Sequence, residues 1–171
     1  MSVENVKSAS ITNLEATPRV ANQAGTGAPS EKQWVHDSVV VPASASADSV
    51  LRVVRVPSTA RDIHLIFESE AMGAGKFDVG VYKSNLTSFV AANATDQDFF
   101  ATVIDCASAV ARTDATNESG TYTLAKRKLP LWEAVGLTAD PGCPFDIALT
   151  VKTTDVTTGA ARAGLTVGYV V

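Results

Sequence analysis

One alternating stretch decides how the rest of the sequence is read: Phe77-Asp78-Val79-Gly80-Val81-Tyr82-Lys83. Its side chains point in turn to two opposite sides, with Phe77, Val79 and Val81 on one of them, which is the period of an extended chain. Glycine weakens the middle of a strand, so Gly80 indicates that another backbone or side chain approaches closely there. We therefore predict a packed strand, with its neighbours arranged around it.

Five further stretches have the same extended period: residues 34–41, 49–56, 62–68, 145–152 and 163–171. The first two are followed by Pro42 and Pro57, and proline cannot donate to a strand ladder. The links between the first three are too short for a helical crossover, which a parallel pair would need. The fold class that this spacing predicts is all-β, an antiparallel β-sandwich of jelly-roll type with seven or eight strands.

Two short helices are expected to cap this sandwich. Residues 95–98 carry the side-chain oxygens that begin a helix, and the apolar residues within 99–104 have i, i+4 spacing. A second short helix is expected between Pro130, which a first helical turn accepts, and Gly136, a residue type that often ends a helix.

The first 31 residues have neither period and end in a Gly, Pro and Ser run. We predict an extended N-terminal arm over 1–31 and a β-sandwich domain over 32–171. The arm is either a disordered tail or a segment that orders along a neighbouring subunit, and the sequence leaves both open. Apolar side chains that the core pattern does not use lie in this arm and in the loop after the first stretch. These candidate contact residues are Leu14, Val20, Leu86, Phe89 and Val90.

Composition excludes several classes of protein. The 171 residues suffice for one domain, since a chain of this size buries roughly 70% of its unfolded surface on folding. The formal net charge is -4, and the basic cluster Lys126-Arg127-Lys128 is too short to follow a phosphate backbone. We therefore expect no nucleic-acid partner.

Neither a secretion signal nor a membrane span is expected. Residues 1–16 contain no apolar run of signal-peptide length, and no window approaches the ~20 apolar residues that cross a bilayer. We expect a cytosolic product with no membrane partner. Cys106 and Cys143 are then expected to be free thiols, although they could pair in an oxidising compartment.

The sequence predicts no catalytic, cofactor or metal site. His36 and His64 are the candidate bases, but both lie within expected strands, where a structural role is more common. The run Gly73-Ala74-Gly75-Lys76 is not a phosphate loop, because Phe77 stands where that motif needs Ser or Thr. Acidic residues in 96–105 lack the glycine-centred spacing of a calcium loop. We predict that the protein is not an enzyme and holds no cofactor or metal.

Several short runs together resemble one family. They are the Val-Pro-Ser-Thr-Ala-Arg run at 56–61, the runs at 77–82 and 98–101, Leu131-Trp132-Glu133-Ala134-Val135-Gly136-Leu137, Phe145-Asp146-Ile147, and Ala163-Gly164-Leu165. Over residues 50–171 the chain resembles the small structural proteins of tailed bacteriophages that are similar to capsid decoration, or cement, proteins. The resemblance implies a jelly-roll or sandwich module without catalytic or cofactor residues.

The resemblance also implies partners and a location. Proteins of that family bind as homodimers or homotrimers to the outside of the phage head and bridge neighbouring copies of the major capsid protein. The expected location is the outer capsid surface of a virion assembled in the host cytoplasm. The candidate contacts named above would then be contacts within the oligomer or with the capsid.

Two other classes of function remain open. A sandwich of this size could be a carbohydrate- or receptor-binding module of a phage fibre or another virion appendage, with exposed Trp34 or Trp132 as stacking platforms. We expect Trp132 to be in the core, because Leu131 and Val135 flank it. An enzyme would be indicated only if the fold placed His36 or His64 beside a carboxylate and a nucleophile in a cleft.

Overall fold

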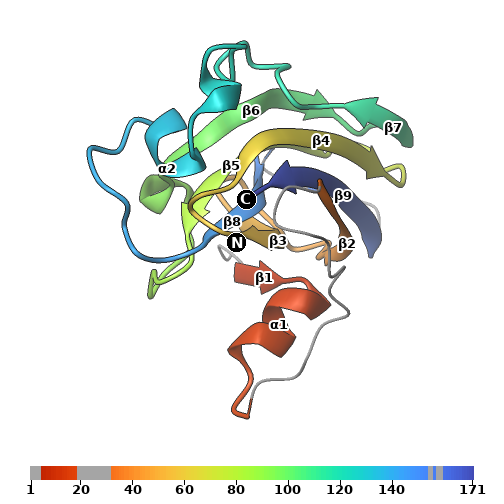
Figure 1. Ribbon diagram of the computed structural model, residues 1–171. Helices are drawn as coiled ribbons and strands as arrows, with labels where there is room; N and C mark the ends of the chain where they lie inside the picture. The colour runs from red at the N-terminus through yellow and green to blue at the C-terminus, as the bar shows by residue number, and fades with distance from the viewer. Residues whose placement is uncertain (1–4, 19–31, 154–155, 157–159) are drawn as a thin grey trace.

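The computed structural model describes residues 5–18, 32–153, 156 and 160–171, and in this part of the chain two β-sheets lie face to face (Figure 1). Sheet A has the strand order β1-β3-β8-β5-β6 and sheet B the order β2-β9-β4-β7. The strands are β1 (Asn5–Lys7), β2 (Gln33–Val41), β3 (Val50–Val56), β4 (Arg61–Ser69), β5 (Lys76–Lys83), β6 (Asp96–Asp105), β7 (Val110–Asp114), β8 (Phe145–Val151) and β9 (Ala161–Val170). The helices are α1 (Ala9–Glu15) and α2 (Leu131–Ala134), with single 3-10 turns at Ala91–Asn93 and Lys126–Lys128.

The connectivity of β2 to β9 is that of a jelly roll. The order β2-β9-β4-β7 faces β3-β8-β5-β6, so that strands distant in sequence are neighbours in both sheets. All the ladders among these eight strands are antiparallel, and only the added β1 pairs parallel, with β3. Eight antiparallel strands connected as two Greek keys, in two facing sheets, define the jelly roll. The predicted fold class is therefore confirmed.

The alternating stretch at residues 77–83 lies in β5, an interior strand of sheet A between β8 and β6. Gly80 has the close neighbour that its position predicted, since a Cβ there would lie 2.2 Å from the backbone carbonyl of Gln97. The ladder between β5 and β6 shifts register around this point, which lets the backbone of β6 cross over the glycine. A larger residue at position 80 would separate the two strands.

The helix expected over residues 95–104 is wrong: these residues form β6. Phe99 and Phe100 are fully buried, and both rings pack against Tyr122, with ring centroids 5.4 and 5.3 Å away. The bulged ladder with β5 interrupts strict alternation, so neighbouring residues both reach the core. Short apolar runs of this kind do not distinguish a buried strand from a helix.

The helix expected near Pro130 is confirmed as α2, which ends shortly before Gly136. The φ of Gly136 is +87°, the left-handed conformation that glycine adopts without strain. Trp132 of this helix is partly buried and packs against the core, as expected. Strand β7, by contrast, was not predicted, because its exposed residues show no clean alternation.

The start of the chain differs from the predicted extended arm. Residues 5–7 form β1, and Ser8 begins α1 by accepting a hydrogen bond from the backbone of Ile11. Ile11 is fully buried, and the Ser8 hydroxyl donates to the Val53 carbonyl at 2.6 Å. This part of the chain is therefore folded against β3, whereas residues 19–31 lie outside the described residues.

Candidate functional site

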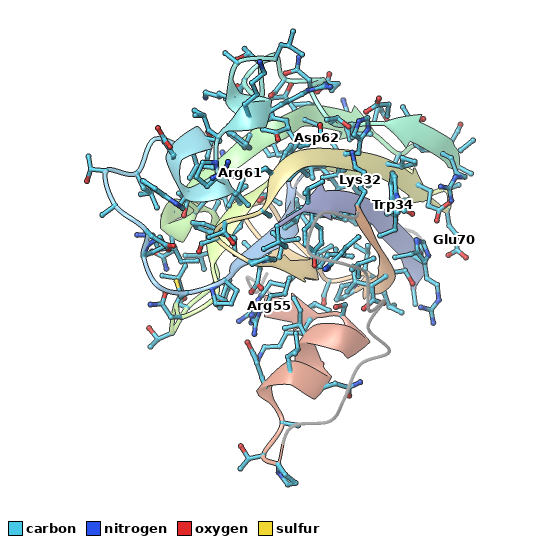
Figure 2. The ribbon with its side chains drawn as sticks, in the orientation of Figure 1. Lys32, Trp34, Arg55, Arg61, Asp62 and Glu70 are labelled. Carbon is cyan, nitrogen blue, oxygen red and sulfur yellow. The ribbon has the colours of Figure 1, made fainter. Side chains whose placement is uncertain are left out.

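The outer face of sheet A is covered by other parts of the same chain. A register shift in β3 between Arg52 and Val54 brings both Arg52 and Arg55 to this face, opposite Ala148 and Asp146 of β8. Helix α1 lies over β3, as Figure 1 shows, and Figure 2 places Arg55 beside it. The shift also explains why strict alternation along β3, assumed from the sequence, assigned these residues to opposite faces.

An ion network fastens α1 to this face. The Asp146 carboxylate, fully buried, accepts hydrogen bonds from the guanidinium groups of Arg52, at 2.7 Å from Nε, and of Arg55, also at 2.7 Å from Nε. Both arginines donate in turn to Glu15 of α1, at 2.6 and 2.9 Å. A buried arginine needs such partners, because an unpaired charge in the interior costs several kcal/mol.

The network also sets the protonation of Glu15. Partial burial raises the pKa of this carboxyl, but hydrogen bonds from Arg52, Lys7 and Arg55 and the charge of Arg52 outweigh burial and lower the pKa to about 2. The lowered pKa keeps the glutamate ionised in acid well below pH 4.5, so α1 stays paired to the sheet there.

The loop after β5 covers a further part of this face, around Tyr82 and Ala148. Phe89 is only 3% exposed and packs on Tyr82, with ring centroids 6.2 Å apart, while the Arg52 guanidinium lies 3.7 Å from its ring centroid. The exposure that the sequence suggested for Phe89 is therefore wrong. Leu86 is partly buried and packs against the same cluster, and Val90 is partly buried and bridges to Ser49.

Of the five predicted contact residues, the structure therefore brings Leu86, Phe89 and Val90 together in one loop. Leu14 lies apart from them in the sequence, on α1, and is partly buried. Val20 lies outside the described residues. Their role as oligomer or capsid contacts stays a prediction.

No described segment covers the outer face of sheet B, where Trp34 is 51% exposed. Paired residues share a face, and three rows cross it: Trp34, Gly168 and His64; His36, Thr166 and Ile66; Ser38, Gly164 and Glu68. The central strand β9 contributes only small side chains to these rows, whereas β2 and β4 on either side contribute larger ones. The face is consequently a trough whose floor is β9.

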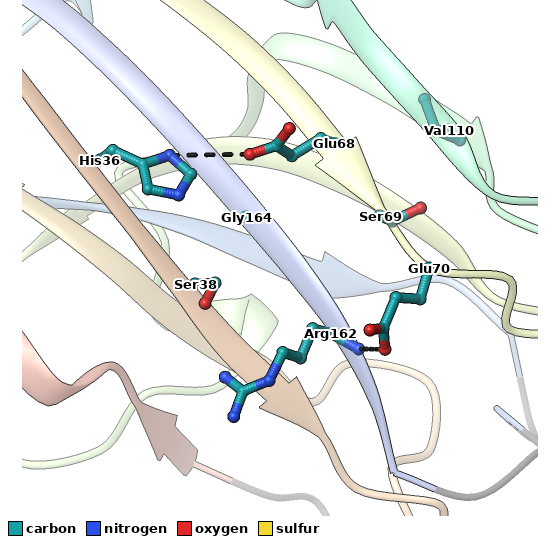
Figure 3. Close-up of a pocket in the computed structure, with 8 residues that line it drawn as sticks. All are labelled: His36, Ser38, Glu68, Ser69, Glu70, Val110, Arg162 and Gly164. Carbon is teal, nitrogen blue, oxygen red and sulfur yellow. Dashed lines mark hydrogen bonds and ion pairs between the residues drawn. The ribbon is translucent and has the colours of Figure 1, made fainter.

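One end of the trough deepens into a hollow of about 330 Å³ (Figure 3). It is lined by His36, Ser38, Glu68, Ser69, Glu70, Val110, Arg162 and Gly164. The Glu70 carboxylate accepts a hydrogen bond from the Arg162 backbone at 2.7 Å, and Glu68 lies 3.7 Å from Nδ1 of His36. Several polar groups thus converge over a glycine floor.

The arrangement around His36 does not form a catalytic relay. Its Nδ1 lies 2.9 Å from the Thr166 hydroxyl and is also the nitrogen that faces Glu68. A relay needs two ring nitrogens, one on the acid and the other on the nucleophile. The imidazole side chain is also 52% exposed. His64 contacts Trp34, with ring centroids 6.4 Å apart.

No cluster of potential metal ligands occurs among the described residues. Nor does the described part of the chain contain a helix long and apolar enough to span a membrane. Cys106 is buried and Cys143 partly buried, and both are free thiols in the structure.

Comparison with known proteins finds two solved structures of similar fold. No protein-family model matches the sequence, and no curated protein matches it either. Among solved structures, the fold is similar to a chain described as the capsid of Ralstonia phage GP4, with a TM-score of 0.64, 15% identity and 96% of each chain covered. It is also similar to a chain of the cyanophage Pam1 capsid asymmetric unit, with a TM-score of 0.51, 12% identity, and 92% of this chain and 97% of that chain covered.

At these identities the likeness is one of fold, and it runs over nearly the whole of each chain. The resemblance to phage structural proteins expected from the sequence is confirmed at that level. Sequence reasoning missed the two features that distinguish the faces, namely the Arg52 and Asp146 pair and the trough. The available signal for the pair was that Arg52 and Asp146 each stand within an otherwise apolar stretch, 49–56 and 145–152, because charged residues are seldom fully buried unless they are paired.

Proposed function

We propose that this chain is a structural protein of a tailed-phage virion, specifically a decoration protein that binds the outer surface of the head and stabilises the lattice of major capsid protein. The likeness of its fold to two phage capsid chains, over at least 92% of every chain compared, is the observation that carries the proposal. A rigid jelly roll without a catalytic relay in its described part suits a protein that acts by contact alone.

In this proposal the protein works as a homodimer or homotrimer, and the side of the molecule bearing α1 and the 84–95 loop makes the contacts. Leu14, Leu86 and Val90 remain only partly buried in the single chain, so a partner can cover the rest of each side chain. Phe89 is buried under the loop, where its packing on Tyr82 holds the loop in place. Linked weak contacts of this kind add up over a repeating lattice.

Binding to heads that lack the protein tests the proposal. The purified protein is titrated onto such particles, occupancy is measured by electron microscopy, and the oligomer is sized by light scattering. We expect saturable binding of a dimer or trimer to the outer surface and a higher temperature of head disruption. A monomer that leaves heads bare and unchanged in stability would overturn the proposal.

Point variants test the contact residues separately. Leu14→Asp and Leu86→Asp should each lower occupancy about tenfold, since each places a charge in an apolar contact. Leu124→Asp is the matched control, because Leu124 is 77% exposed and lies beside Arg61 and Val170 of sheet B. Deleting residues 1–30 is a poorer test of the contacts. It also removes the buried side chain of Ile11 and the hydrogen bond from Arg52 to Glu15, and so changes the fold as well. Equal occupancy for all three variants would remove Leu14 and Leu86 from the contact surface.

A further inference from the structure

The trough on sheet B contains a large aromatic ring that the fold leaves facing solvent. Trp34 is 51% exposed, although an indole of this size is normally well buried on average. A Cβ on Gly168 would lie 2.8 Å from each of three atoms of its six-membered ring, Cε3, Cζ3 and Cη2. Equal distance from three atoms of a hexagon holds only on the axis through its centre. The ring therefore lies face down on the glycine.

Because one face of the indole rests on Gly168, its other face is the one turned outward. Lys32 Nζ, paired with Asp62, lies over the ring, 5.8 Å from its centroid, and His64 flanks the ring at a tilt of 47°. Figure 2 shows Lys32 and Trp34 close together on this side of the molecule. The arrangement fixes the position of a half-exposed aromatic ring, with the Lys32 side chain above it and no described sheet or loop covering it.

The hollow lies on the same face further along these strands, with the row of His36 and Thr166 between it and the ring. Outward residues of β2 follow one another as Trp34, His36 and Ser38, so platform and hollow extend over about 14 Å at the rise of a strand. Within the hollow, Glu68, Glu70 and Arg162 supply acceptors and donors near the glycine floor. A flat apolar platform beside convergent polar groups is the composition of a small-molecule site.

We propose that this trough binds a neutral oligosaccharide, with one sugar ring stacked on Trp34 and the next hydroxyl groups bonded in the hollow. A pyranose has an apolar face of C–H groups and an edge of hydroxyls, which matches a platform followed by carboxylate and guanidinium groups. The two glutamates outnumber the one arginine, so phosphate-bearing or carboxylate-bearing ligands are disfavoured by charge. The site is independent of the α1 side assigned to capsid contact.

Fluorescence of two single-tryptophan variants tests the site. Trp132→Phe leaves Trp34 as the reporter, and Trp34→Phe leaves Trp132. Each is titrated with maltotriose, cellotriose and chitotriose into the millimolar range, with isothermal calorimetry on the wild-type protein as a second measurement. We expect a saturable change in the Trp132→Phe protein with at least one of these sugars, matched by wild-type heat, and none in Trp34→Phe.

Variants of the hollow then locate the hydroxyl contacts. Glu68→Gln and Arg162→Gln should weaken binding by tenfold or more, and Gly164→Ala should do so by raising the floor, while Val103→Asp, at a 50% exposed position of β6 in sheet A, leaves affinity unchanged. No heat and no fluorescence change with any of the three sugars would overturn the proposal, and so would an equal response from both single-tryptophan proteins. Binding of a single-stranded oligonucleotide in place of sugars would also overturn it. Occupancy on phage heads is measured separately, so either proposal can fail alone.

Discussion

The two outer faces of this jelly roll differ in how far the chain itself covers them. On sheet A, outward positions hold a fully buried carboxylate and a buried arginine, and the chain returns as α1 and the 84–95 loop to cover them. On sheet B, the outward positions of β9 hold small residues beside an exposed indole on β2, and no described segment returns over them. The same architecture thus covers one outer face with segments of its own chain and leaves the other without a described cover.

The largest effect is expected at the buried pair on sheet A. Asp146→Ala removes the main partner of Arg52, which is 1% exposed, so we expect a loss of about 3 kcal/mol in the free energy of unfolding. Urea denaturation measures this loss. The double variant Arg52→Met with Asp146→Leu removes both charges and should lose less than the single one. If the double variant were the less stable, the pairing would not be the main role of these residues.

A matched pair of glycines compares the two faces next. Gly80→Ala on sheet A places a Cβ 2.2 Å from the backbone of Gln97, and we expect a cost of about 2 kcal/mol as β5 and β6 separate. Gly164→Ala on sheet B meets its nearest atoms at 3.4 Å, and should cost below about 1 kcal/mol. Thermal unfolding of both variants checks the ranking. Equal losses would show that sheet B is packed as tightly on its outer side as sheet A.

The ion pairing that holds α1 on sheet A should stabilise the protein less in acid. The pKa of Glu15 is lowered from 4.5 to about 2 in the folded protein, so the stability it adds is present above pH 4.5 and is lost as the pH falls towards 2. Glu15→Gln should remove this dependence and speed hydrogen exchange in α1 about fivefold at pH 7. Exchange in β9, on the opposite sheet, serves as the internal reference. Unchanged exchange in α1 would mean that burial of Ile11 alone holds the helix.

The smallest effect is expected at the edge of sheet A. Burial, together with the hydrogen bond and charge of Asp98, raises the pKa of Asp96 from 3.8 to about 6. A raised carboxyl pKa favours the folded state at low pH, and that contribution is lost as the pH rises through 6. Asp96→Asn should therefore stabilise the protein by about 1 kcal/mol at pH 7.5 and by less at pH 5. Asp105→Asn, on the same strand but 57% exposed in its side chain, should give no gain.

The strands were predictable because their apolar period survives in the sequence, as in Phe77, Val79 and Val81. The jelly-roll type followed from strand spacing and from the family resemblance. Strand β6 was mistaken for a helix because its bulge breaks the period, and a bulge depends on the partner strand rather than on the local sequence. The bulge in β3 concealed Arg52 and Arg55 in the same way.

The candidate site on sheet B could be anticipated only in part. Trp34 was named as a stacking platform if exposed, but its exposure depends on Gly168, which is 134 positions away in the chain and opposite it only through β2–β9 pairing. The hollow likewise combines residues of β2, β4 and β9 that no sequence spacing relates. Both the position of the Trp34 ring and the hollow depend on contacts between segments distant in sequence, and local sequence patterns do not predict such contacts.

Strand β1 has a consequence for how copies of this chain meet side by side. It occupies the edge of β3 over three residue pairs, and the Ser8 backbone then donates to the Arg52 carbonyl at 2.8 Å. The hydrogen-bonding groups that a foreign strand would use are thereby already taken, and a strand of three residues is too short to template another. A chain that begins after residue 8 would instead present the bare edge of β3 and be open to fibre growth by lateral strand addition.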